Sequence, residues 1–92
     1  MSDRKIEKGE TSVLSIGLDW TEWLESDTII SSVWKSSDEI IITRPQSDNS
    51  STSCYVGGGV LGKSYNITNT IETQSGRKDS RYIKIVIKNL AA

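Results

Sequence analysis

Hydrophobic and polar residues alternate along much of the chain, and a period of two is typical of β-strands that bury one face. The clearest alternation lies in the C-terminal third, where Tyr65, Ile67 and Ile71 share one face and Ile83, Ile85 and Ile87 occupy every second position. We expect two strands there, Tyr65–Thr73 and Ser80–Lys88. The segment between them, Gln74–Lys78, is rich in turn residues and contains Gly76. The pattern therefore predicts a long β-hairpin.

The numbering of the hairpin isoleucines also predicts the length of its loop. All of them are odd-numbered: Ile67, Ile71, Ile83, Ile85 and Ile87. Because a shift of one residue moves every side chain to the other face of a sheet, odd residues must pair with odd residues to keep one apolar face. That pairing requires an odd number of residues in the connection. We expect a loop of three or five residues, unless a bulge intervenes.

Four further strands are predicted upstream, separated by turn residues at spacings of about ten residues. They span Ser12–Leu18, Thr28–Trp34, Glu39–Thr43 and Thr52–Val56. The second has isoleucine or valine on both faces, which predicts either two covered faces or a bulge near Ser31 and Ser32. The third contains three consecutive isoleucines, Ile40 to Ile42, and this run predicts a short strand buried on both faces.

Other segments lack the strand pattern. Trp20, Trp23 and Leu24 stand at the i, i+3 and i+4 spacing of one helical turn, with Asp19 and Glu22 at capping-box spacing. This turn is expected to close one end of the core with two indoles. The polar segment 44–51, with the only proline, is predicted to be a mobile loop, and residues 1–9 a flexible N-terminal arm.

These elements predict an all-β fold, a small antiparallel immunoglobulin-like β-sandwich of six to seven strands with one short helical turn, over residues 10–90. A tyrosine near the start of the penultimate strand supports this fold. Tyr65 follows Gly62 there, as in the tyrosine corner of immunoglobulin-like domains, in which the hydroxyl bonds a backbone group upstream. The inter-sheet disulfide of antibody domains is absent, because Cys54 is the single cysteine. We expect Cys54 to be a small buried strand residue.

The segment Gly57–Ser64 matches the phosphate-binding string G-x-x-x-x-G-K-[ST]. A P-loop requires a helix directly after its Lys-Ser pair, because the free N–H groups of that helix bind the phosphates. The residues after Ser64 alternate with a period of two and are β-branched or otherwise poor helix formers. We therefore interpret the string as a glycine turn that leads into the hairpin.

Composition limits the possible chemistry. The 92 residues include no histidine and have a formal net charge of −1. The common histidine-dependent nucleophiles and zinc ligand sets are thereby excluded, and there is no basic surplus to suggest nucleic-acid binding. No apolar run approaches the length of a membrane span or a signal peptide. We expect no enzyme activity, no catalytic, cofactor-binding or metal-binding residues, no cofactor, and neither nucleic acid nor membrane as a partner.

Several strings of the sequence resemble a family of small virion proteins of tailed phages, described as fibre–tail adaptor or neck/tail proteins. The most specific are D-W-x-x-W-L from Asp19 and D-T-I-x-S-S-x-W from Asp27. Further similarity includes Gly58-Gly59, the segment from Gly62 to Thr73, and Gly76-Arg77-x-Asp79, so that it extends over residues 8–88. The polar loop after Pro45 departs from the pattern.

The resemblance implies a non-enzymatic structural adaptor that joins tail, neck or fibre components of the virion through protein–protein contacts. It also implies several copies in the particle, as a homo-oligomer, and a protein made in the host cytoplasm and incorporated into virions. An alternative from another class is a ligand-binding module for host-surface carbohydrate, with Trp20, Trp23 or Trp34 as stacking platforms. The sequence does not decide between the two.

Overall fold

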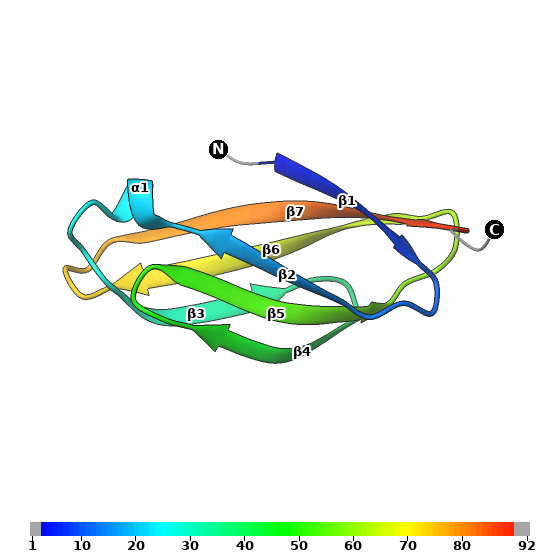
Figure 1. Cartoon of the computed structure of the whole chain (residues 1–92), viewed down its shortest axis with the longest axis horizontal. Helices are drawn as coiled ribbons and strands as arrows, with labels where there is room; N and C mark the ends of the chain where they lie inside the picture. The colour runs from blue at the N-terminus through cyan, green and yellow to red at the C-terminus, as the bar shows by residue number, and fades with distance from the viewer. Residues whose placement is uncertain (1–2, 90–92) are drawn as a thin grey trace.

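The computed structural model describes residues 3–89, and within that range it forms seven strands and one helical turn. The elements are β1 (Asp3–Gly9), β2 (Leu14–Asp19), α1 (Thr21–Leu24), β3 (Ile29–Lys35), β4 (Ile40–Ser47), β5 (Ser51–Gly58), β6 (Ser64–Thr73) and β7 (Lys78–Lys88). Figure 1 shows them as two layers of strands, with α1 at one end. The predicted immunoglobulin-like sandwich is confirmed.

One sheet, sheet A, has four strands in the order β1-β7-β6-β3, and the other, sheet B, has three in the order β2-β5-β4. All described pairings are antiparallel except that of β1 with β7, which is parallel. The long hairpin β6–β7 forms the centre of sheet A.

The parity prediction for this hairpin is confirmed. Odd residues pair with odd residues, as in Ile67 with Ile83 and Tyr65 with Ile85. The last pair of the ladder is Glu72 with Lys78, which leaves the five residues 73–77 in the connection. Gly76 lies in this loop with a φ of 97°, a conformation that glycine adopts without steric cost.

The bulge in the second predicted strand is also present, one residue earlier than expected. Ile29 pairs with Thr73 and Ser31 with Glu72, so that Ile30 is the extra residue of β3. The bulge changes which face each side chain occupies. Ile29 and Trp34 are buried, whereas Ile30 and Val33 are exposed.

Two predictions about β4 and its surroundings are wrong. The run of isoleucines is not buried on both faces, because the outer face of sheet B is uncovered: Ile40 is 7% exposed but Ile41 is 59% exposed. The segment 44–51 is not a mobile loop either. β4 continues to Ser47 through an irregularity between Thr43 and Gln46, and this irregularity accommodates Arg44 at a φ of 52° and the proline.

A tight turn then joins β4 to β5. Its backbone closes with a hydrogen bond from Asp48 N to Ser51 O, and the Asp48 carboxylate accepts hydrogen bonds from the N–H groups of Ser50 and Ser51. An aspartate that bonds its own following backbone in this way defines a turn geometry. The polar composition of this segment thus reflects turn formation, and not mobility.

The flexible arm predicted for residues 1–9 is a third error. Asp3–Gly9 is a strand that pairs in register with Tyr82–Lys88, although residues 1–2 lie outside the described part. The arm was predicted from its charge and lack of apolar period. Pairing with the edge of β7 satisfies the backbone hydrogen-bonding groups of this strand. Burial of apolar side chains makes only a small contribution to holding the strand in place.

The core lies between the two sheets. It includes Ile16, Leu18, Trp20, Leu24, Ile29, Trp34, Ile40, Cys54, Val56, Tyr65, Ile67, Ile71, Ile83, Ile85 and Ile87. Cys54 is 1% exposed, which confirms its predicted role as a small buried strand residue. The helical turn is present, and Trp20 is fully buried beside it. The predicted capping box is absent, since Asp19 accepts instead from the N–H of Thr21.

Candidate protein–protein interface

The outward side of sheet B has an unusual composition for a solvent-facing β-surface. Its outward positions between Asp19 at one end and Arg44 at the β4 edge include Ser15, Gly17, Ile41, Thr43, Ser53, Tyr55 and Gly57. None of these side chains is charged at neutral pH. We call these seven residues, together with Val13, the sheet-B face.

Three exposed apolar side chains lie on the sheet-B face. Val13 is 62% exposed, Ile41 is 59% exposed and Tyr55 is 41% exposed. Gly57 lies between two of them. It pairs with Ile41 across β4 and β5, and a Cβ at Gly57 would lie 3.4 Å from Val13 Cγ2. The Arg44 guanidinium lies 5.7 Å from the centre of the Tyr55 ring, at the border of this surface. The result is a neutral, partly apolar surface.

The outward side of sheet A differs from the sheet-B face in its charge. Exposed charged residues occur on all four of its strands: Lys5, Glu7, Lys35, Glu72, Lys78 and Lys84. A surface of interspersed charges favours contact with water. Exposed apolar residues are also present there, Val33 and Tyr82 among them. Each has a lysine two residues further along its own strand, Lys35 and Lys84 respectively. Of the two sheets, sheet B offers the surface better suited to a protein partner.

The tryptophans are not the stacking platforms that a carbohydrate site would need. Trp20 is fully buried and Trp34 is 9% exposed. Trp23 is partly buried, and the Arg77 guanidinium covers its ring at 4.0 Å from the centroid. The Arg81 guanidinium lies in the same way 4.1 Å from the ring centre of Trp20. These cation–π contacts use aromatic surface that a sugar would otherwise occupy.

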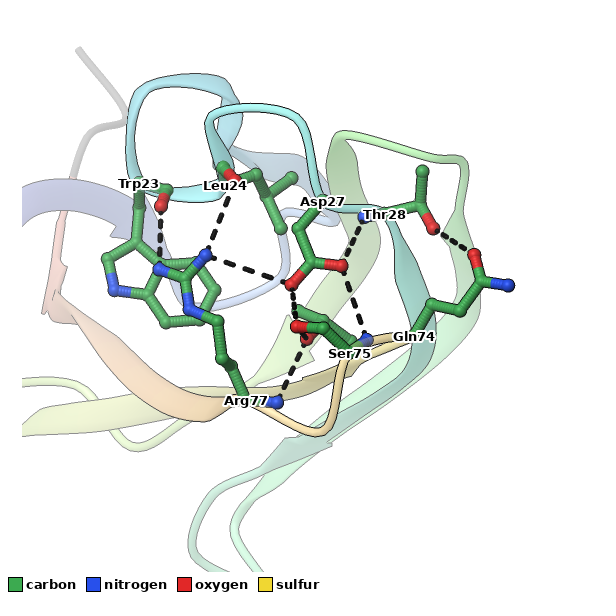
Figure 2. Close-up of polar contacts among 8 residues, drawn as sticks. Trp23, Leu24, Asp27, Thr28, Gln74, Ser75 and Arg77 are labelled. Carbon is green, nitrogen blue, oxygen red and sulfur yellow. Dashed lines mark hydrogen bonds and ion pairs between the residues drawn. The ribbon is translucent and has the colours of Figure 1, made fainter.

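Figure 2 shows how Arg77 attaches the helical turn to the β6–β7 hairpin. Its guanidinium donates hydrogen bonds to the carbonyl oxygens of Trp23, at 2.8 Å, and Leu24, at 3.3 Å, and lies 3.7 Å from an Asp27 carboxylate oxygen. The same carboxylate accepts from the hydroxyl and the N–H of Ser75. These bonds, that from the Ser75 hydroxyl foremost, lower the pKa of Asp27 to about 2. This end of the sandwich is a fixed structural cluster.

The glycine segment is a structural turn, as predicted. Ser64–Thr73 is the strand β6, so the helix that a P-loop requires is not present. Gly59 has a φ of 97° and its N–H donates to Glu39 O at 2.9 Å. The Tyr65 hydroxyl accepts from Val60 N at 3.0 Å and donates to a Glu39 carboxylate oxygen at 2.6 Å. The predicted tyrosine-corner bond to an upstream backbone group is therefore confirmed.

Among residues 3–89, no three or more His, Cys, Asp or Glu side chains are grouped so as to hold a metal ion. The same part of the chain contains no helix of the length and apolarity needed to cross a membrane. The sheet-B face itself was missed from the sequence. The one indication of it in the sequence is the serine and glycine residues at alternate positions of β2 and β5. The same residues are equally typical of ordinary solvent-facing positions.

Comparison with solved structures supports the fold. The structure described as "Solution structure of the PKD domain from KIAA 1837 protein" matches with a TM-score of 0.57 and 18% sequence identity. The alignment covers 98% of this chain and 83% of that one. At this identity the likeness shows a shared PKD/Ig-like fold alone.

Comparison of sequences gives the family. Among curated proteins, none matches the chain. The family model described as "Podophage GP4 fiber-tail adaptor protein gp77" matches residues 8–86, which is most of the chain and nearly the whole range over which the sequence resembles phage adaptor proteins. The chain therefore belongs to the podophage GP4 fiber-tail adaptor protein gp77 family.

Proposed function

We propose that this protein is a non-enzymatic structural adaptor of a phage virion, which joins tail, neck or fibre components through protein–protein contacts. Membership of the gp77 family supports this function, since the family is described as a fiber-tail adaptor. The protein acts in the assembled particle, as one of several copies, after synthesis in the host cytoplasm. Catalytic, cofactor-binding and metal-binding residues have no part in this function.

The observation that supports a contact function best is the sheet-B face. Val13, Ile41 and Tyr55 expose apolar surface to water in the isolated domain. The residues around them, Gly57 and the serines, are small and leave these side chains accessible to a partner. Burial of an exposed aliphatic or aromatic side chain contributes about 1.5–3 kcal/mol to association. Apolar and aromatic groups with few charges are typical of the centre of a protein interface.

The lack of charge on this face also affects its choice of partner. A neutral face can dock on another without leaving ionised groups buried and unpaired. Arg44, at the border of the face, and Asp19, at one end of it, can then fix the orientation of the partner. At the rim of an interface, charged groups contribute more to specificity than to affinity. We infer that the sheet-B face binds a neighbouring virion subunit.

The substitution Ile41→Asp tests this function. It places a carboxylate in the middle of the sheet-B face, where a docked partner would bury it. We expect incorporation into purified particles to fall at least about tenfold, because each 1.4 kcal/mol lost corresponds to a factor of ten in binding. Incorporation is measured by quantitative mass spectrometry of particles assembled with the variant.

Val33→Asp is the matched control. Val33 is an exposed aliphatic residue on an edge strand as well, 46% exposed, but on the outward side of sheet A. Both substitutions should lower the free energy of unfolding by less than about 1 kcal/mol, as surface changes usually do. Equal incorporation of the two variants would contradict the sheet-B face as the contact surface. Absence of the wild-type protein from particles would contradict the adaptor function itself.

A further inference from the structure

A buried lysine lies where the first strand meets the last. Lys8 is 0% exposed and pairs in register with Ile87, on the side of sheet A that faces the core. Its Nζ donates a hydrogen bond to the neighbouring carbonyl oxygen of Gly9 at 2.7 Å. Within residues 3–89 no carboxylate oxygen lies within ion-pair distance of this ammonium, although Glu10 is close enough to influence it.

This burial is unfavourable. A lysine ammonium has three hydrogen-bond donors and is strongly hydrated in water. Removing a charged group from water without a partner of opposite charge is costly, and burial accordingly lowers the pKa of Lys8. The position opposite Ile87 would hold an aliphatic side chain at no such cost.

The remaining contacts of β1 are also modest. The strand lies at the edge of sheet A and pairs in parallel, which is slightly less stable per residue than antiparallel pairing. Ile6 is its one aliphatic residue and is only partly buried. The ion pair of Glu7 with Lys88 is 2.7 Å long, but its side chains are 48% and 50% exposed, so that it contributes little.

The edge of β7 to which β1 binds is, by contrast, well suited to bind a strand. Ile83, Ile85 and Ile87 of β7 are at most 1% exposed and form one continuous aliphatic row. The edge of β7 offers a row of backbone groups that pairs with seven residues of β1, from Asp3 to Gly9. An edge of this kind recruits an added strand when it is uncovered.

We propose that β1 is a displaceable strand, and that the β7 edge beside it is a docking site for an extended segment of another protein. The segment replaces β1 by β-augmentation, with backbone hydrogen bonds along β7 and alternate side chains beside the β7 isoleucines on the core-facing side of sheet A. An aliphatic residue opposite Ile87, in place of Lys8, lets this segment bind the β7 edge more tightly than β1 does. The site is on sheet A and is independent of the sheet-B face.

The test uses two fluorescein-labelled synthetic peptides of residues 2–10, one with the wild-type sequence and one with Lys8→Ile, titrated with the full-length protein. Fluorescence anisotropy should show saturable binding of the Lys8→Ile peptide, at least ten times tighter than binding of the wild-type peptide. The protein variant Lys8→Met, whose own β1 is better held, should bind the Lys8→Ile peptide at least ten times more weakly than the wild-type protein does. Lys5→Met, at an exposed position of the same strand, is the control and should leave binding unchanged.

Hydrogen exchange of the free protein provides a second measurement. The amides of β1 should exchange at least ten times faster than those of β6, and Lys8→Met should slow them, because local opening depends on how well a segment is held. Failure of both peptides to bind would overturn the proposal. So would equal affinity of the wild-type and Lys8→Met proteins, or protection of β1 equal to that of β6.

Discussion

Replacement of Ile85 by aspartate is expected to lower the free energy of unfolding by at least about 3 kcal/mol, a large fraction of the stability of a domain of this size. Ile85 is 0% exposed and lies in the centre of sheet A, between Tyr65 on β6 and Ile6 on β1. An aspartate there would place a carboxylate among the aliphatic side chains of the core. Urea unfolding followed by circular dichroism measures the change.

The adjacent residue provides the control. Lys84 lies on the same strand with its side chain on the exposed face of sheet A, opposite Asn66 and Lys5. Lys84→Asp should therefore change the free energy of unfolding by less than about 1 kcal/mol. Similar losses for the two variants would show that the inward and outward faces of β7 have been assigned incorrectly.

Trp20→Ala is expected to have the second large effect, a loss of about 3–5 kcal/mol, as is usual when a buried tryptophan is truncated. The indole is 0% exposed and its ring centroid lies 5.5 Å from that of Trp23, in an edge-to-face arrangement. Its Nε1–H donates to Asn69 Oδ1 at 3.2 Å and to Thr52 Oγ1 at 3.3 Å. The truncation thus removes packing and a buried hydrogen-bond donor together.

Trp23→Ala is the matched variant, since Trp23 belongs to the same aromatic pair but is only partly buried. It should cost less than half as much as Trp20→Ala, measured in the same unfolding experiment. The wild-type protein should show blue-shifted tryptophan emission, because two of its three indoles are buried. A larger loss for Trp23→Ala would mean that Trp20 is not the residue that closes this end of the core.

The central hairpin could be predicted because its information is local. Alternating isoleucines specify both strands, and their odd numbering limits the loop between Glu72 and Lys78 to an odd length. The tyrosine corner was predictable for the same reason, since Tyr65 bonds the backbone of Val60, only five residues upstream. In both cases the pattern and the contact lie in the same short segment.

The N-terminal strand was missed because its contacts are remote in sequence. β1 contains Lys5, Ile6 and Lys8 without an apolar period, and its partner, β7, is at the other end of the chain. No local pattern indicates a parallel pairing over that distance. The length of β4 was underestimated for another reason. Arg44 and Pro45 are signals for a break in a central strand, but an edge strand can accommodate them as an irregularity.

The candidate interface was the least predictable part. The sequence shows that Ile41 stands in an apolar run, but whether its side chain is covered depends on what lies outside sheet B. Serine and glycine at Ser15, Gly17, Ser53 and Gly57 have no pattern of their own, and their significance is visible only when the strands β2, β5 and β4 bring them together on one face. A surface assembled from three strands is a property of the tertiary structure.

The burial of the single cysteine has a practical consequence. Cys54 lies on the inner face of β5, and burial raises the pKa of its thiol to about 11. Because the thiolate is the reactive form, this thiol should resist alkylating reagents at neutral pH while the sandwich is closed. The native chain is therefore effectively free of reactive thiols. A cysteine introduced at an exposed strand position would be the sole reactive site for a spectroscopic label or a crosslinker. The slow rate at which Cys54 itself is modified would report the rate at which the two sheets separate.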